Sequence, residues 1–210
     1  MVKNETVLVL APHTDDGELG CGGSIAKLLE NGNTIYHVAF SICEESVPEG
    51  YPKDVLKHEF RRSNKLLGLE DDNIITYNYP VRKFTYHRQE ILEDIVILRN
   101  RLKPSVIFMP CSSSLHQDHI TIYNEGIRAF KHYQCFGYDL PWDSTNFSTQ
   151  AFFTLEGKHV AKKWEAISQY KTQNFRNYCD EEFIFGLARV RGAQIGRRYA
   201  EAFEAIRILV

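Results

Sequence analysis

The chain has 210 residues, 43% of them hydrophobic, and a formal net charge of −2 at pH 7. These values fit one globular domain spanning 1–210, with room for a sizeable core. They give no electrostatic argument for nucleic acid or an anionic membrane as partner, and no stretch approaches the roughly 20 apolar residues of a membrane span. Five scattered cysteines and the absence of a signal-peptide pattern favour reduced thiols and a cytoplasmic protein.

The first chemically informative segment is a polar, glycine-rich stretch that follows a short apolar run at 7–10. The run predicts a buried strand, and the stretch at 11–23, A-P-H-T-D-D-G-E-L-G-C-G-G, places His13, Asp15 and Asp16 on the loop after it. In open α/β sheets, ligands bind beyond the carboxyl ends of the strands. Histidine and aspartate are zinc ligands, and a second carboxylate beside them can take a proton from water. The competing interpretation is an ordinary polar loop with an N-capping aspartate; a phosphate-binding loop is a poorer match.

The middle of the chain alternates predicted helices with predicted strands. We expect helices near 24–31, 54–67 and 84–102, and strands near 34–42, 73–79 and 105–109. Such alternation predicts a parallel sheet with right-handed crossovers. In this part of the chain, His37 fits a half-buried structural residue better than a ligand. Arg61 and Arg62 fit a charged solvent face better than a substrate contact.

A second polar cluster follows the strand predicted at 105–109. The segment 111–119, C-S-S-S-L-H-Q-D-H, places His116, Asp118 and His119 beyond the carboxyl end of that strand. A catalytic zinc site needs three protein ligands and one open position. The first cluster together with one of these two histidines would supply the three ligands, which leaves the other histidine for acid or electrostatic work.

The last third of the chain is less informative about function. We expect helices near 120–133, 158–170 and 181–195, strands near 136–140 and 151–155, and a closing strand or helix over 196–210. Tyr138 and Trp142 fit a stacking wall for a sugar and ordinary core equally well. The loops 44–53 and 138–149 match no motif. Together the elements predict an α/β fold: a three-layer, Rossmann-like, mostly parallel sheet with helices on both faces and its active site at the carboxyl ends of the strands.

The two histidine motifs in this order resemble those of the LmbE/PIG-L family of zinc-dependent N-deacetylases. The match consists of H-T-D-D-G-E-L-G-C-G-G at 13–23 and H-Q-D-H at 116–119, with weaker similarity at 57–68 and in the tail at 196–203. The chain departs from the family pattern where Thr14 replaces a proline and where Gly17 replaces a glutamate. It departs again before His116, where Ser114 and Leu115 stand in place of a tyrosine.

This resemblance implies hydrolysis of the N-acetyl group of an N-acetylglucosamine-type sugar or conjugate, with release of acetate. It implies that His13, Asp16 and His119 bind Zn²⁺, or another divalent metal such as Fe²⁺. It further implies a small amino-sugar substrate as partner and allows a homo-oligomer.

The resemblance also implies roles for three residues around the metal. Asp15 matches the general base, and His116 matches the histidine that stabilises the oxyanion or protonates the leaving amine. Asp118 matches a carboxylate that orients a histidine. Two other functions stay open: a metal-dependent hydrolase of another bond, such as a phosphoester, and a sugar-binding protein without catalysis.

Overall fold

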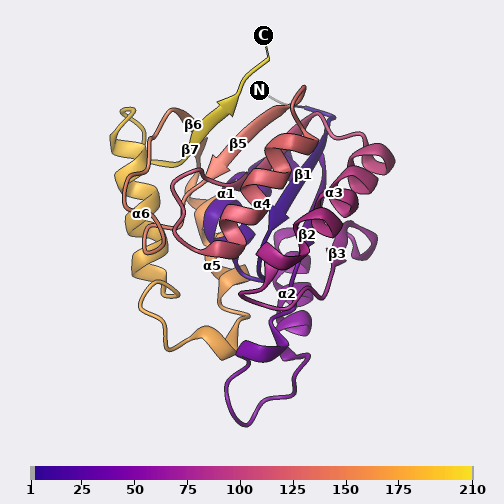
Figure 1. Cartoon of the computed structure of the whole chain (residues 1–210). Helices are drawn as coiled ribbons and strands as arrows, with labels where there is room; N and C mark the ends of the chain where they lie inside the picture. The colour runs from indigo at the N-terminus through magenta and orange to yellow at the C-terminus, as the bar shows by residue number, and fades with distance from the viewer. Residues whose placement is uncertain (1–2, 210) are drawn as a thin grey trace.

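A computed structural model describes residues 3–209, and its centre is a seven-stranded sheet in the order β3-β2-β1-β4-β5-β7-β6 (Figure 1). The first five strands in this order are parallel, whereas β7 is antiparallel to both β5 and β6. The strands are β1 Thr6–Ala11, β2 Thr34–Ala39, β3 Ile74–Thr76, β4 Val106–Pro110, β5 Gln134–Tyr138, β6 Ala151–Leu155 and β7 Tyr199–Arg207.

Helices cover both faces of this sheet, which confirms the predicted three-layer, mostly parallel α/β fold. They are α1 Asp16–Glu30, α2 Val55–Leu67, α3 Arg88–Leu102, α4 Gln117–Ala129, α5 Gly157–Ile167 and α6 Glu181–Ala193. Helices α1, α2, α5 and α6 pack on one face, and α3 and α4 pack on the other. Among the described residues, no helix combines the length and apolar character that crossing a membrane requires.

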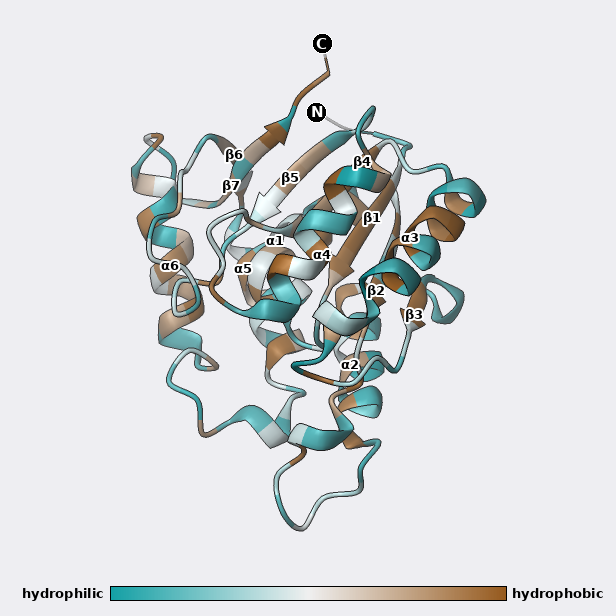
Figure 2. Ribbon diagram, in the orientation of Figure 1, coloured by the Kyte–Doolittle hydropathy of each residue, from teal (hydrophilic) through white to brown (hydrophobic). Residues whose placement is uncertain are grey.

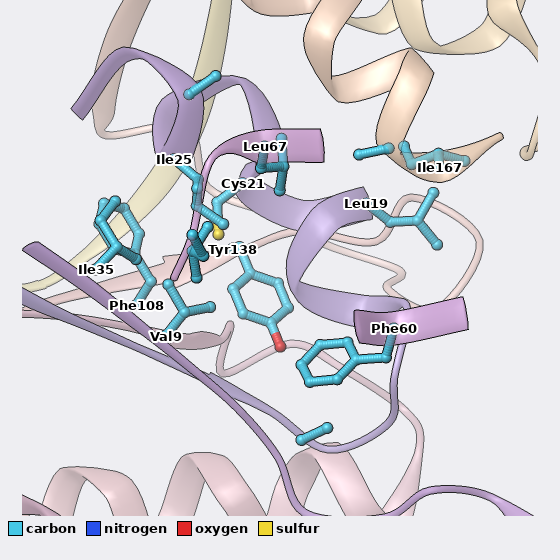
Figure 3. Packing of buried hydrophobic residues seen from close by; sticks show 14 of the residues in the cluster. Val9, Leu19, Cys21, Ile25, Ile35, Phe60, Leu67, Phe108, Tyr138 and Ile167 are labelled. Carbon is cyan, nitrogen blue, oxygen red and sulfur yellow. The ribbon is translucent and has the colours of Figure 1, made fainter. Parts of the chain in front are cut away.

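The central strands β1 and β4 are continuous apolar runs, as strands buried on both faces require. Figure 2 shows β1 as a brown arrow among helices that carry both brown and teal segments. Figure 3 shows part of the larger core cluster, with Val9 and Phe108 from the sheet and Ile25 from α1 around Tyr138. Tyr138 is 1% exposed and its hydroxyl donates to the carbonyl of Leu10 at 3.0 Å. It is a core residue, which decides for Tyr138 between the two alternatives that the sequence leaves open.

Helix α1 begins eight residues earlier than the sequence predicts, at Asp16 rather than near Ser24. The glycines that weigh against a helix are needed for packing: a Cβ at Gly20 would lie 2.3 Å from the Tyr138 ring. The helix has non-helical dihedral angles at Cys21 (φ −144°), and a new helical segment starts beyond this kink.

Glu201 of β7 caps that second segment of α1. The buried Glu201 carboxylate accepts hydrogen bonds from the backbone N–H groups of Gly23 at 3.0 Å and Ser24 at 2.6 Å. It also pairs with the buried Lys163 of α5 at 2.7 Å, so the charge is compensated. The predicted helix start near Ser24 therefore coincides with this capped second segment and misses the first turn and a half.

The order of the strands determines where a ligand can bind. The chain passes from β1 to β2 on one side and reaches β4 on the other side of β1. Such a reversal of direction is a topological switch point, and it opens a crevice beyond the carboxyl ends of the two strands. The segments that follow β1 and β4 carry His13 and His116, so the two polar clusters meet at this crevice.

Candidate metal centre and active site

Three side chains from the two clusters form a compact triangle of donor atoms. Asp16 Oδ2 lies 3.1 Å from His13 Nδ1 and 3.2 Å from His119 Nε2, and the two nitrogens are 3.4 Å apart. Tetrahedral zinc with bonds of about 2.0–2.1 Å places its ligands about 3.3–3.4 Å from one another. The three atoms therefore fit one face of a zinc tetrahedron, with the fourth position open toward the cavity.

Two further carboxylates fix the tautomers of the histidines. His13 Nε2 donates to Asp118 Oδ2 at 3.0 Å, and His119 Nδ1 contacts Asp143 Oδ2 at 3.1 Å. Each histidine thus directs its other ring nitrogen into the triangle, where it would be the atom that binds a metal, which is how carboxylates support histidine ligands of metals. The sequence analysis expects this role for Asp118, as a carboxylate that orients a histidine. Asp143 was missed, because it lies in the 138–149 loop, where no motif points to it.

The electrostatics of the triangle also suit a cation. Burial would raise the pKa of Asp16, but the adjacent His119 and His13 hold it well below its usual range. Burial would lower the pKa values of both histidines, yet Asp16 and the outer carboxylates raise that of His13 well above normal and that of His119 to about 9. The protein thus gathers negative charge around two nitrogens, and a metal that binds there displaces their protons.

Asp15 lies at the N-cap position of α1, but its side chain makes no capping hydrogen bond. It lines the cavity instead. Burial and the neighbouring Asp16 carboxylate raise the pKa of Asp15 to about 6. A carboxylate with such a pKa is well suited to accept a proton near neutral pH. The N-capping interpretation of this residue therefore does not describe its side chain.

His116 borders the open side of the triangle. Its ring centroid is 5.0 Å from those of both His13 and His119. Its Nδ1 accepts the backbone N–H of Asp118 at 3.2 Å and caps α4. Burial, together with the two other histidines, lowers the pKa of His116. The residue is therefore a neutral imidazole that carries its proton on Nε2, ready to donate a hydrogen bond.

These groups share one cavity of about 350 Å³. Leu19, Leu56, Val81 and Leu140 give it an apolar wall, and Trp142 stands at its edge. The pair Arg61 and Arg62 does not line the cavity: both are exposed, and Arg61 pairs with Asp71 at 2.8 Å.

Other arginines line it instead, namely Arg82 and Arg176, which the sequence analysis missed. Of the two loops that match no motif, 44–53 contributes Ser46 and 138–149 contributes three residues, among them Asp143.

The family model described as GlcNAc-PI de-N-acetylase, PIG-L, matches residues 8–130. This match includes both histidine motifs and more than half of the chain. The chain belongs to the PIG-L family. Its place in the family accounts for the order of the two clusters, and the structure shows that they meet at the switch point of the sheet.

Individual PIG-L relatives are similar over most of the chain. The uncharacterized deacetylase YaiS of Escherichia coli is 26% identical over 179 residues, covering 81% of this chain and 92% of that protein. The N,N′-diacetylchitobiose deacetylase of Pyrococcus horikoshii superposes with a TM-score of 0.78 at 22% identity, over 95% of this chain and 83% of that one.

A protein with another activity shares the fold equally well. The 4-carboxy-2-hydroxymuconate hydratase of Pseudomonas putida superposes with a TM-score of 0.80 at 17% identity, over 98% of each chain. Likeness at this level establishes the fold alone, and the reaction has to be argued from the site.

Behind the PIG-L motif, a buried polar network supports the loop that holds Asp15. The Tyr170 hydroxyl donates to the carbonyl of Thr14 and lies 2.8 Å from Glu18 Oε1. Asn64 links the network further: its Nδ2 donates to Glu18 at 2.9 Å, and its Oδ1 accepts from His37 Nδ1 at 2.6 Å. Burial raises the pKa of Glu18 to about 8, so it is a neutral hydrogen-bonding group at pH 7.

His37 explains a departure from the PIG-L pattern. It is fully buried rather than half-buried, and a Cβ at Gly17 would lie 2.0 Å from its Nε2. The imidazole therefore fills the space that a side chain at position 17 would need. The glutamate of the family pattern is absent at this position, and the neighbouring Glu18 is buried and hydrogen-bonded to Asn64 and Tyr170.

Proposed function

We propose that the chain, acting as one domain over 1–210, is a zinc-dependent deacetylase that hydrolyses the N-acetyl group of an amino sugar of the N-acetylglucosamine type. The observation that carries this proposal is the triangle of His13, Asp16 and His119, open on the side faced by the cavity that Asp15 and His116 also line. Membership of the PIG-L family supports it, as do relatives that bear the name deacetylase.

Each residue has a role in amide hydrolysis. A bound divalent metal supplies Lewis acidity, which acidifies water and polarises an amide carbonyl. Asp15 accepts the proton of the attacking water and can return it to the departing amine. His116 donates a hydrogen bond from Nε2 to the oxygen on which negative charge develops, a contribution that is usually large. Asp118 and Asp143 hold the metal-binding histidines in place.

The alternative of a two-metal phosphoesterase has less support. The second group of possible metal ligands among the described residues, His13, His116 and Asp118, shares His13 with the first. His13 Nε2 is already engaged by Asp118, and His116 Nδ1 by a backbone N–H. We therefore infer a single metal, which favours attack on an amide over a displacement that needs two metals.

The first test combines metal content with product release. We expect one zinc per chain by elemental analysis, and acetate release from N-acetylglucosamine or its conjugates that a chelator abolishes and added zinc restores. The Asp16→Ala variant should lose both metal and activity, whereas Asp15→Asn should lose activity alone. A protein that takes up no metal from excess zinc, or a fully active Asp15→Asn variant, would contradict the proposal.

A further inference from the structure

Two arginines give the cavity a chemical character that deacetylation alone does not require. Neither Arg82 nor Arg176 contacts a carboxylate among residues 3–209, although elsewhere in the fold Arg61, Arg88 and Arg191 each do. Both residues are exposed, and both line the same cavity as the metal triangle.

Arg82 is tied to the metal site through its backbone. Its N–H donates to Asp118 Oδ2 at 2.6 Å, and that same oxygen accepts the hydrogen bond of His13. The residue adopts a positive φ of 65°, which a residue with a side chain rarely takes without a compensating constraint. Its position relative to the metal ligands is thus fixed, while its side chain remains available to a ligand.

Arg176 is held by its own neighbours in the segment between α5 and α6. Its Nε donates to the buried Gln173 at 2.6 Å, and its guanidinium carbon lies 5.6 Å from the centre of the Tyr178 ring. That ring stacks on Trp142 at 3.7 Å with an interplanar angle of 6°. Arg176 forms no ion pair with a carboxylate among the described residues, so its guanidinium can pair with an anionic ligand in the cavity that it lines.

The two arginines are the positively charged side chains of the cavity wall outside the histidines. The carboxylates of the wall, Asp15, Asp16 and Asp143, belong to the metal end, and the last two already contact histidines. Beyond them the wall mixes apolar side chains with neutral polar groups. A guanidinium offers only donors and carries a positive charge. The ligand that complements both arginines is therefore one that presents acceptor oxygens and a negative charge.

We propose that the substrate is an anionic N-acetyl amino sugar, whose phosphate or carboxylate group binds to Arg82 and Arg176 while its acetamide lies at the metal. This inference rests on the proposed deacetylase function and adds the class of substrate to it. The competing explanation is that the arginines merely offset the carboxylates of the site, in which case they matter equally for neutral and anionic substrates.

The test is a comparison of matched substrates and variants of the zinc-loaded enzyme. The substrates are neutral N-acetylglucosamine, its 1-phosphate and 6-phosphate, and N-acetylmuramic acid, which carries a carboxylate. The variants are Arg82→Ala, Arg176→Ala and, as control, Arg101→Ala. Arg101 lies in the last turn of α3, shortly before the chain enters β4, whereas the site lies beyond the carboxyl end of that strand. The anionic members separate phosphate from carboxylate as the group that is recognised.

We expect at least one anionic substrate to exceed N-acetylglucosamine about tenfold or more in kcat/KM. On that substrate, the kcat/KM of each cavity variant should fall about 10- to 100-fold, mainly through a higher KM, because a charge-assisted hydrogen bond is removed. The same variants should lose at least threefold less of their kcat/KM on the neutral sugar than on the anionic one, and Arg101→Ala should change neither. Equal losses on neutral and anionic substrates, or no preference for an anion, would overturn the inference.

Binding of products gives a second measurement that does not depend on turnover. Glucosamine 6-phosphate should bind the zinc-loaded protein more tightly than glucosamine in calorimetry, and Arg82→Lys should keep part of this difference while the two alanine variants lose it. Absence of acetate from every substrate would contradict the deacetylase function. Calorimetry would then still decide whether the cavity prefers anionic sugars, so the two failures are distinguishable.

Discussion

Replacing Asp143 by Asn measures how far the metal site depends on the carboxylates behind its histidines. Asp143 Oδ2 contacts His119 Nδ1 at 3.1 Å and accepts a hydrogen bond from the Ser114 hydroxyl. An amide oxygen can accept the same hydrogen bonds but carries no charge. In its flipped orientation the amide presents its NH₂ group and favours the tautomer with the proton on His119 Nε2, the atom in the metal triangle.

The size of the effect follows from this environment. Loss of such a supporting carboxylate typically lowers metal affinity 10- to 100-fold, or about 1.4–2.7 kcal/mol. The Asp143 side chain is 16% exposed, and His119 behind it is almost buried, so water screens their contact little. We therefore expect zinc to bind Asp143→Asn about 30-fold more weakly than the wild type, near the middle of that range.

Competition with a chromogenic chelator at pH 7.5 would give the zinc affinities. Asp139→Asn is the matched control, because Asp139 lies four residues earlier and pairs with Arg191 at 3.1 Å and Ser144 at 2.6 Å rather than with a histidine. Wild-type zinc affinity in Asp143→Asn, or an equal loss in the control, would refute the assigned role of Asp143.

Three further predictions concern the general base, the buried network and pH. Asp15→Asn should lower kcat about 10²- to 10⁴-fold while zinc content stays at one per chain, measured by acetate release and elemental analysis. Tyr170→Phe removes the hydrogen bond to the Thr14 carbonyl. We expect the free energy of unfolding in urea to fall by about 1–3 kcal/mol and kcat to fall at nearly constant KM. Unchanged values would contradict the inference that Tyr170 supports the loop that holds Asp15. Burial lowers the pKa of His37 to about 4 from its ordinary 6.5, so the unfolded chain binds the extra proton first and stability falls as pH drops from about 6.5 to about 4. Between pH 7.5 and 4.5, the free energy of unfolding of zinc-free His37→Gln should therefore fall by about 2–3 kcal/mol less than that of the wild type, measured by urea unfolding. The control variant His58→Gln, at an exposed site, should show the same fall as the wild type.

The sequence predicts the fold well because its evidence is local and strong. Buried parallel strands are short apolar runs, and those at 7–10 and 106–109 are bounded by polar or proline residues that mark their ends. Each ends where a polar cluster begins, so the edge of the sheet that carries the site follows from chain order. The start of α1 cannot be predicted in the same way, because glycine disfavours a helix by about 1 kcal/mol. The contacts that compensate for Gly20 and Gly23 come from β5 and β7, which lie far away in the sequence.

The parts of the site that the sequence does not reveal come from loops without a pattern. Asp143, Arg82 and Arg176 are common polar residues in irregular segments, and only the fold brings them to the cavity. Their contacts span long separations in sequence: Arg82 meets Asp118 36 residues later. Composition and periodicity carry no information about such pairs, whereas the two histidine motifs concentrate their ligands within a few residues.

Glu201 can cap the second segment of α1 only after almost the whole chain has been synthesised. The glutamate lies 178 residues after Gly23, whose N–H group it accepts. At about 5–20 residues per second, a ribosome needs about 10–35 s to travel that distance. During this interval the glycine-rich helix that begins at Asp16 has neither its cap nor the strand that carries it. A chain that ends before β7 would therefore keep both histidine motifs but lack the hydrogen bonds that support the helix after the first of them.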